Sequence, residues 1–436
     1  MDKIFLILPG CDDTNRGDQA LIWETVAIAR EAGYCGQYYM IADMEKSHQS
    51  EQEAIGHTDY ILPHPSTYFK DHSNIQYGKL LKIKWAVVSI KDSLRALLLF
   101  SKLLRRFAIK LFPENIQKSI QLFERADAAF VKGGGFLHSY GGFVNTYANF
   151  YDLYHIMLAL SMGKDVYVMP NSFGPFLSPG TGRMIRKVLS KCKFISVRES
   201  LSRDMLYNEL SIEAKLLPDL AFYLGNCDKL NEEQKQKLNA IPFDKKCVAM
   251  TVRPYRFPGA DDPDEEYQKY KMVISDFIVY LNKKGYHPVL VEHTFSDNEH
   301  EQDMSCIKDI EKILDNSCDY SVYSDLSLNC RQLKYVYSKF DYVLGTRFHS
   351  VIFSIANLVP AIAITYGGNK GMGIMKDIGL SEYALSIDQL SLDSLIDTFD
   401  MLVANIDHVK QQILAYMDLA QKKKVELIAS LKGGTK

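Results

Sequence analysis

The sequence predicts an α/β protein whose strands form doubly wound parallel sheets in two domains. Its 436 residues exceed the size at which a single hydrophobic core stops growing, so two domains are expected. Short apolar runs, of the length of buried strands, alternate with helical stretches, and this order is typical of parallel sheets covered by helices on both faces. A polar stretch divides the runs into two series.

The first series is expected to form an N-terminal domain over residues 1–225. Its first strand lies within residues 1–10, an apolar run that carries Asp2 and lacks a small-residue cleavage site, so we do not interpret it as a signal peptide. A loop and a helix at 18–32 follow. The other predicted strands of this series are 128–131, 166–169, 194–197 and 215–217.

The second series is expected to form a C-terminal domain over residues 245–405. The polar stretch 226–244 before it suits an interdomain linker, and residues 406–436 are expected to form a C-terminal helix. The predicted strands of this domain are 247–252, 287–291, 340–344 and 360–366.

Composition narrows the class of protein. With 47% hydrophobic and 24% charged residues the chain is expected to be soluble and globular, and its net charge of -2 argues against nucleic acid as a partner. The eight cysteines are scattered without a CxxC pair, which favours reduced thiols in a cytoplasmic protein over a disulfide or zinc framework. No apolar stretch reaches the roughly 18 residues of a membrane span, although a peripheral membrane contact stays open. No metal is expected.

The segment Gly345-Thr346-Arg347-Phe348-His349-Ser350 follows a predicted strand and begins a predicted helix. Carboxyl ends of parallel strands are where open α/β sheets bind ligands, and helix N-termini attract anions. Arg347 is therefore expected to hold a phosphate or carboxylate beside His349, with Gly345 and Ser350 contributing to the same site. The alternative is an arginine at a helix start and a histidine satisfied by a backbone carbonyl.

Two more cations follow predicted strands of the C-terminal domain. Lys370 lies in the glycine-rich loop 367–373, and a βαβ connection brings it to the sheet edge that carries Arg347 and His349. Arg253 precedes Pro254, which holds it extended at the end of strand 247–252, where its planar guanidinium suits an anion. Alternatively, Arg253 is a surface residue paired to the acidic run 261–266.

The N-terminal domain supplies candidate contacts to a hydroxyl-rich ligand. These residues carry amide, carboxylate or imidazole groups and lie at strand ends or helix starts: Asn15, Asp18, Gln19, His138 and Asn171. Asp18 is equally well explained as a helix N-cap. Arg198 and Glu199 are expected to form an internal ion pair instead.

Residues 79–110 carry nine cations and only one acid, so this stretch has a charge of +8 while the rest of the chain sums to -10. Leucine and phenylalanine side chains interleave with the cations at helical spacing. Such a helix suits an anionic membrane surface, with its apolar face down and its cations at the headgroups. The alternative is a helix packed into the core with a solvated basic face.

Eight motifs in one order resemble the polysaccharide pyruvyl transferase family and cover about residues 10–380. They are GDQAL, GGGFLH, PNSFGPF, SVRES, LLPDLAF, VRPYRF, GTRFHS and YGGNKGMGIMKDIGL. The resemblance implies two Rossmann-like domains that face a cleft, as in GT-B glycosyltransferases, with the acceptor sugar on the N-terminal side and the donor on the C-terminal side. It also implies transfer of the pyruvyl unit of phosphoenolpyruvate to a sugar, usually as a cyclic ketal, without a cofactor.

The resemblance assigns the general acid to His349 and donor binding to Arg253 and Arg347, whereas the phosphate contact of Lys370 is our own inference. It allows an acceptor carried on a polyprenyl diphosphate. The competing interpretation is a GT-B glycosyltransferase with a nucleotide-sugar donor, which would release a nucleoside diphosphate instead of phosphate. A catalytically inactive sugar-binding protein is a third possibility, but it would be expected to lack the histidine or the cations.

Overall fold

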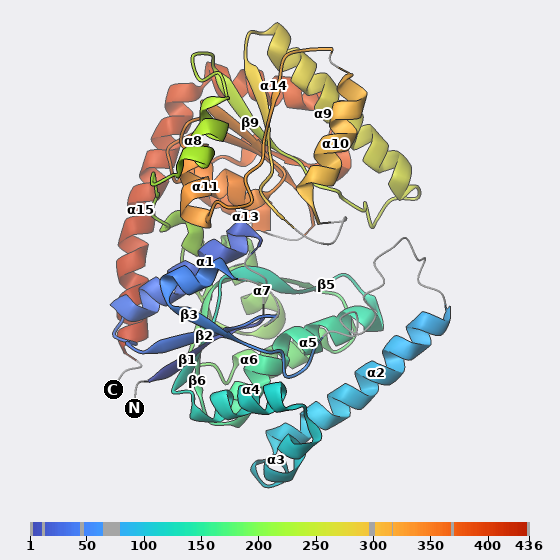
Figure 1. The fold of residues 1–436 in the computed structure, drawn as a ribbon, viewed down its shortest axis with the longest axis vertical. Coiled ribbons are helices and arrows are strands. Elements are labelled where there is room, and N and C mark those ends of the chain that lie inside the picture. Colours follow the sequence, from blue (N-terminus) through green and yellow to red (C-terminus); the bar gives the residue numbers. More distant parts are fainter. Residues whose placement is uncertain are drawn as a thin grey trace.

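The computed structural model describes residues 3–10, 14–43, 48–63, 79–295, 301–315, 317–367 and 370–433, and for 79–82 it describes only the helical backbone. Cys11, the side chains of Lys79 and Lys82, and residues 434–436 of the predicted C-terminal helix lie outside this set. Two parallel sheets lie one above the other in Figure 1, each covered by helices. The predicted fold class of two doubly wound α/β units is confirmed.

The first sheet has the strand order β3-β2-β1-β4-β6-β7-β8, and β5 pairs with β6 beside this path. Every pairing is parallel; for example, Leu6 of β1 lies between Tyr39 of β2 and Ala129 of β4. The strands are β1 (Ile4–Leu8), β2 (Gln37–Ile41), β3 (Ile55–Thr58), β4 (Ala128–Val131), β5 (Gly134–Ser139), β6 (Asp165–Phe176), β7 (Phe194–Val197) and β8 (Lys215–Leu216). Its helices are α1 (Arg16–Glu31), α2 (Lys79–Leu97), α3 (Lys102–Ala108), α4 (Glu114–Arg125), α5 (Gly142–Ser161), α6 (Thr181–Leu189) and α7 (Ser200–Leu210).

The second sheet has the order β11-β10-β9-β12-β13-β14, also with parallel pairings. Its strands are β9 (Cys247–Thr251), β10 (His287–Val291), β11 (Ser321–Tyr323), β12 (Tyr342–Gly345), β13 (Ala361–Thr365) and β14 (Ala384–Ser386). The helices after β8 are α8 (Glu232–Asn239), α9 (Pro263–Lys283), α10 (Asp303–Leu314), α11 (Cys330–Tyr337), α12 (Phe348–Ile355), α13 (Lys370–Ile378), α14 (Leu392–Ala404) and α15 (Ile406–Lys432). The polar stretch 226–244 lies between the two sheets in sequence and contains α8.

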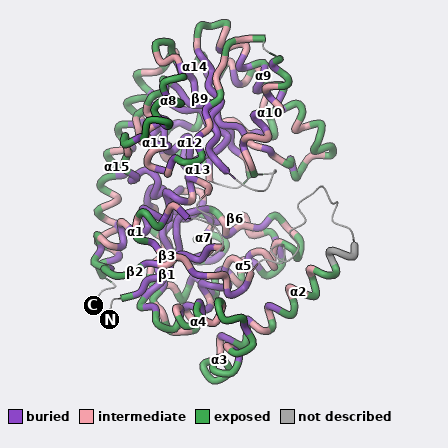
Figure 2. The backbone as a smooth tube through the Cα atoms, viewed as in Figure 1, coloured by how far each residue is buried: buried purple, intermediate pink, exposed green. Residues whose placement is uncertain are grey.

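Central strands such as β1 (IFLIL) and β4 (AAFV) are apolar and buried along their whole length because helices cover both faces of the sheet. In β1 the side chains alternate between two cores: Ile4, Leu6 and Leu8 pack on one face, and Phe5 and Ile7 on the other. The second of these cores continues through α1 into the second sheet, so the two halves share one apolar cluster. Figure 2 shows this buried interior as a continuous band from the lower to the upper sheet.

The C-terminal helix α15 connects the two halves. It runs along the left side of Figure 1 from the upper half to the lower half, where both chain ends lie. The Tyr34 hydroxyl donates to the Leu431 carbonyl at 3.1 Å, and Lys424 pairs with Glu31 at 2.9 Å. These contacts fix the end of α15 against the first domain. None of the described helices is long and apolar enough to cross a membrane.

Candidate active site

Two adjoining cavities lie where the carboxyl ends of the two sheets face each other. The smaller has a volume of about 320 Å³ and is lined by residues that follow β1, β4, β12 and β13. The larger, of about 770 Å³, opens beside it, and Phe348, Tyr366 and Lys370 line both. Topological switch points lie between β1 and β4 and between β9 and β12, which are the places where open α/β sheets bind ligands.

His349, the second residue of α12, lines the smaller cavity and is 7% exposed. Its ring packs against Gly17 of α1 so closely that a Cβ on that glycine would lie 2.0 Å from Nδ1. The Nε2 atom is buried and has no hydrogen-bond partner among the described residues. Burial, together with the charges of Lys370 and Arg198, holds the pKa of His349 well below its ordinary value. The ring nitrogen is therefore available to a ligand.

The charges of three cations, Lys370, Arg198 and Lys132, act on this histidine. Lys370 begins α13, and burial and the charge of Arg198 lower its pKa to about 7. Lys132, directly after β4, pairs with Asp18 at 2.8 Å. Burial alone would raise the pKa of Asp18, but the ion pair with Lys132 outweighs this effect and lowers it. An anion that entered this cavity would relieve the mutual repulsion of the cations.

Arg198 belongs to a buried polar group at the end of β7. It pairs with Asp219 at 2.6 Å, and its Nε donates to the Ser172 hydroxyl at 2.7 Å. The predicted internal ion pair of Arg198 is confirmed, but its partner is Asp219 and not Glu199. One guanidinium nitrogen, Nη2, is buried without a hydrogen-bond partner among the described residues, and a Cβ on Gly135 would lie 2.9 Å from it.

Arg347 is the N-cap residue of α12 and lines the smaller cavity, but its guanidinium is already paired. Nε and Nη2 lie 2.7 and 2.6 Å from one carboxylate oxygen of Asp303, and Nη2 also donates to the Glu301 carbonyl at 2.6 Å. The other oxygen of Asp303 accepts from the backbone of His293 and Thr294. This network ties the start of α12 to the loop after β10, so Arg347 shapes the cavity wall.

The other predicted donor contacts lie behind the cavity surface. Arg253 stacks over the ring of Tyr366 at 4.4 Å and lines neither cavity, and no ion pair joins it to the described acidic run 261–266. The Ser350 hydroxyl is buried against Thr251 at 2.9 Å. Gly345 has to be glycine because a Cβ there would lie 2.5 Å from Val351. The last two residues therefore seat α12 against β12.

Of the five predicted acceptor contacts, three line one of the two cavities and two do not. Asn15 and Asp18 line the smaller cavity, and Asn15, not Asp18, is the N-cap of α1. His138 lines the larger cavity, and burial lowers its pKa. Neither Gln19 nor Asn171 lines either of these two cavities. The Gln19 side chain accepts from the Cys330 amide at 2.7 Å, and the Asn171 amide donates to the carbonyls of Lys132 and Met169.

Sequence reasoning missed several residues of the site. Lys132 follows a predicted strand, so the rule that found Lys370 could have found it. Asp152 lies within α5, where no sequence signal marks it, yet it lines the smaller cavity and burial raises its pKa to about 7. His293 lines the same cavity, and burial lowers its pKa to about 3.

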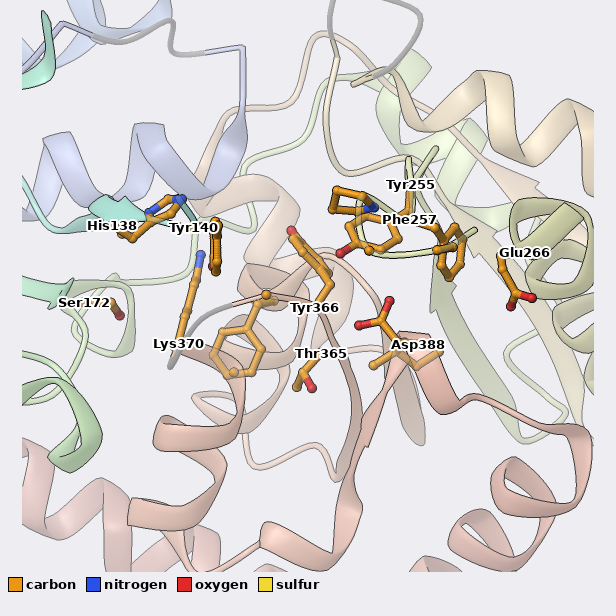
Figure 3. Close-up of a pocket in the computed structure, with 18 of the residues that line it drawn as sticks. His138, Tyr140, Ser172, Tyr255, Phe257, Glu266, Thr365, Tyr366, Lys370 and Asp388 are labelled. Atoms are coloured by element: carbon orange, nitrogen blue, oxygen red, sulfur yellow. The ribbon is translucent and has the colours of Figure 1, made fainter. Parts of the chain in front are cut away.

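The larger cavity has a different character. Aromatic rings and two carboxylates surround it: Tyr140, Tyr255, Phe257, Tyr366, Glu266 and Asp388. Figure 3 shows Lys370 extending toward Tyr140 and His138, with Tyr255 and Asp388 farther along the cavity. Ring faces pack against the C–H groups of a sugar, and carboxylates accept from its hydroxyls, so this cavity suits a polar ligand with apolar faces.

The architecture is that of GT-B glycosyltransferases and sugar-nucleotide epimerases. The chain is similar to UDP-GlcNAc 2-epimerase from Neisseria meningitidis, with a TM-score of 0.51 and 11% identity over 94% of each chain. It is also similar to MnaA of S. aureus bound to UDP, with a TM-score of 0.55 and 10% identity over 95% of this chain and 91% of that one. At such low identity these structures show the fold alone.

The sequence defines the family. A family model described as polysaccharide pyruvyl transferase matches residues 15–368, and the chain belongs to this family. It is also 28% identical over 312 residues to the amylovoran biosynthesis protein AmsJ of Erwinia amylovora, a match that covers 69% of this chain and 71% of the relative. The family identified from the eight motifs is thereby confirmed, and the protein is a transferase of polysaccharide biosynthesis.

Proposed function

We propose that the protein transfers the pyruvyl unit of phosphoenolpyruvate to a sugar of a surface-polysaccharide precursor, closes a cyclic ketal and releases phosphate. The observation that carries this proposal is the smaller cavity, which is lined by the unpartnered Nε2 of His349 and by the cations Lys132 and Lys370, while the charge of the buried Arg198 acts from behind its wall. Phosphoenolpyruvate carries a phosphate and a carboxylate, and fixed cations in a partly dry cleft bind such a donor strongly.

Donor binding and protonation are coupled in this proposal. In the free protein burial and the neighbouring cations hold the pKa of His349 well below its ordinary value, and burial and the charge of Arg198 lower the pKa of Lys370 to about 7. A bound trianion raises both values because an opposite charge stabilises the protonated form. His349 therefore becomes an acid only when the donor is present, which protects the enzyme from unproductive proton transfer.

The chemistry then follows from the donor. His349 gives a proton to the methylene carbon of phosphoenolpyruvate, which leaves an oxocarbenium-like centre at the next carbon. A sugar hydroxyl forms a C–O bond to that centre, and the bond to phosphate breaks with phosphate as the leaving group. A second hydroxyl of the same sugar closes the ketal. Of the two hydroxyl protons, one restores His349 and the other leaves with phosphate.

The remaining residues take supporting roles. Asp152, with a pKa of about 7 in the same cavity, is placed to accept a hydroxyl proton. Asn15 and Asp18 contact the acceptor from the wall of the smaller cavity, and the aromatic larger cavity holds the rest of the sugar chain or its polyprenyl diphosphate carrier. Arg347 and Arg253 support the wall of the donor cavity through their contacts with Asp303 and Tyr366. We assign no cofactor.

Phosphorus NMR of one mixture tests the proposal against a nucleotide-sugar donor. The full chain is incubated with phosphoenolpyruvate, UDP-glucose and a panel of aryl and lipid-linked glycosides. We expect inorganic phosphate to appear at the expense of phosphoenolpyruvate, and not with a His349→Gln variant. Release of UDP with phosphoenolpyruvate unchanged would overturn the proposal in favour of glycosyl transfer.

A further inference from the structure

Residues 79–111 form an arm that overhangs the first domain. It consists of α2, a short turn of helix at Leu98–Phe100, α3 and a second short turn at Ile109–Leu111. In Figure 1 it lies along the lower right, outside the body formed by the sheet and α5, and Figure 2 shows it mostly exposed or half-buried. We call it the α2–α3 arm.

Few side chains hold the α2–α3 arm on the domain. Ala96, Leu99 and Ala108 are buried, and the Tyr154 hydroxyl of α5 donates to the Ala96 carbonyl at 3.0 Å. Arg105 is buried as well; its Nε donates to the Leu99 carbonyl at 2.6 Å and its Nη1 lies 3.6 Å from Glu124. The arm is thus anchored between residues 96 and 108, and much of its surface is free of the core.

The free surface carries exposed apolar side chains on both helices, which we call the apolar stripe. Ile83, Val87, Ile90 and Leu94 follow each other at spacings of four and three residues, each about 60% exposed, so they share one face of α2. On α3, Leu103 and Phe107 are 79% and 75% exposed. Of the 24 large apolar side chains that are exposed in the described residues, ten lie on this arm. A helix packed into the core would have buried them, so that alternative is wrong.

Unpaired cations accompany the stripe. Lys84, Lys91, Lys102, Arg106 and Lys110 are exposed, and none forms an ion pair with a described residue. The whole stretch 79–110 has a charge of +8 against -10 for the rest of the chain. An anionic surface would therefore attract the arm and repel the body, which orients the molecule with the arm toward that surface.

We infer that the α2–α3 arm docks the protein on an anionic lipid membrane, with the apolar stripe in the interface and the cations at the headgroups. The alternative partner for the apolar stripe is a protein, or a second copy of this chain, that presents an acidic groove. The lipid surface is favoured because exposed apolar side chains share one face of α2 and exposed, unpaired cations accompany them, which is the pattern of an interfacial helix. This inference does not depend on the proposed transfer chemistry, although it would bring the cavities to an acceptor carried on lipid.

Co-sedimentation of the full chain with vesicles tests the inference. We expect binding to vesicles that contain phosphatidylglycerol, little binding to phosphatidylcholine alone, and release as salt rises. The triple variant Lys102→Gln, Arg106→Gln and Lys110→Gln should lower the partition coefficient by about 100-fold, since each cation near such a surface contributes about fivefold. Arg105 is left unchanged because it anchors the arm.

A matched triple variant on α6, Arg183→Gln, Arg186→Gln and Lys187→Gln, removes the same charge from an exposed helix of the same domain and should bind as the native protein does. The pair Leu103→Ser and Phe107→Ser should also abolish binding without lowering the melting temperature, because both side chains are exposed. Equal sedimentation with both kinds of vesicle, or equal losses in the two triple variants, would overturn the inference. So would a dimer of the native protein that the Leu103 and Phe107 changes dissociate, because the stripe would then be an interface between copies.

Discussion

The contact between Gly17 and His349 makes Gly17→Ala a sharp test of the site. Gly17 belongs to the first turn of α1 and His349 to α12, so the contact joins the two domains. A Cβ on Gly17 would lie 2.0 Å from Nδ1, 2.3 Å from Cγ and 2.8 Å from Cβ of His349. Non-bonded heavy atoms rest at about 3.5 Å, so the imidazole has to retreat by roughly 1.5 Å.

The two effects of Gly17→Ala differ in size. Overpacking costs about 1–3 kcal/mol of unfolding free energy, while alanine in a helix returns up to about 1 kcal/mol relative to glycine. The net loss of stability is therefore about 0–3 kcal/mol. A catalytic group misplaced by about 1 Å loses on the order of 100-fold in rate, so activity should fall far more than stability.

The assay is kcat/KM for phosphoenolpyruvate together with urea unfolding. Gly225→Ala is the control, because nothing lies within 4 Å of a Cβ there and the backbone is not left-handed. We expect Gly17→Ala to lose on the order of 100-fold in kcat/KM while the control keeps its rate. A variant with full activity would refute the reasoning, since His349 could then move without consequence.

Three further predictions follow from the same geometry. His349→Gln should fold normally and lose about 10²–10⁴ in kcat, measured by phosphate release. Arg347→Lys should lower the melting temperature and raise the KM for phosphoenolpyruvate, because an ammonium cannot reproduce the contacts of Nε and Nη2 with Asp303 and Glu301 that shape the cavity wall. Arg253→Lys should raise the KM less, because it loses only the stacking on Tyr366, and an unchanged KM in both variants would show that neither residue shapes the donor site. His155 and His293 have folded-state pKa values of about 3, below their unfolded values, so the unfolded chain binds protons first. Unfolding free energy should therefore fall below about pH 6.5, by about 1.4 kcal/mol per pH unit for each histidine, and a flat urea profile would contradict this.

Much of the site could be predicted because it lies at strand ends. The alternation of apolar runs gives the order of parallel strands, and their carboxyl ends meet at one edge. His349, Lys370, Asn15 and Asp18 reach the smaller cavity for that reason. The family motifs and the strand pattern therefore led to the same place in the fold.

The direction of each side chain could not be predicted, because it depends on partners distant in sequence. Gln19 turns inward to a backbone amide 311 residues later, and Arg347 turns to Asp303 at the start of another helix. Asp152 lies in mid-helix, where its burial follows from packing and not from a local pattern. For residues 79–110, helical periodicity alone could not distinguish a stripe that faces the core from one that faces solvent.

The central claim is that a pyruvyl unit from phosphoenolpyruvate becomes a ketal on a sugar. The most direct measurement is the mass of the acceptor after incubation with the native protein and phosphoenolpyruvate, with His349→Gln as the matched control. We predict that the acceptor gains the mass of pyruvic acid less one water and that one phosphate is released for each molecule converted. An acceptor that gains a glycosyl unit from a nucleotide sugar, or an equal gain in the His349→Gln reaction, would contradict the account.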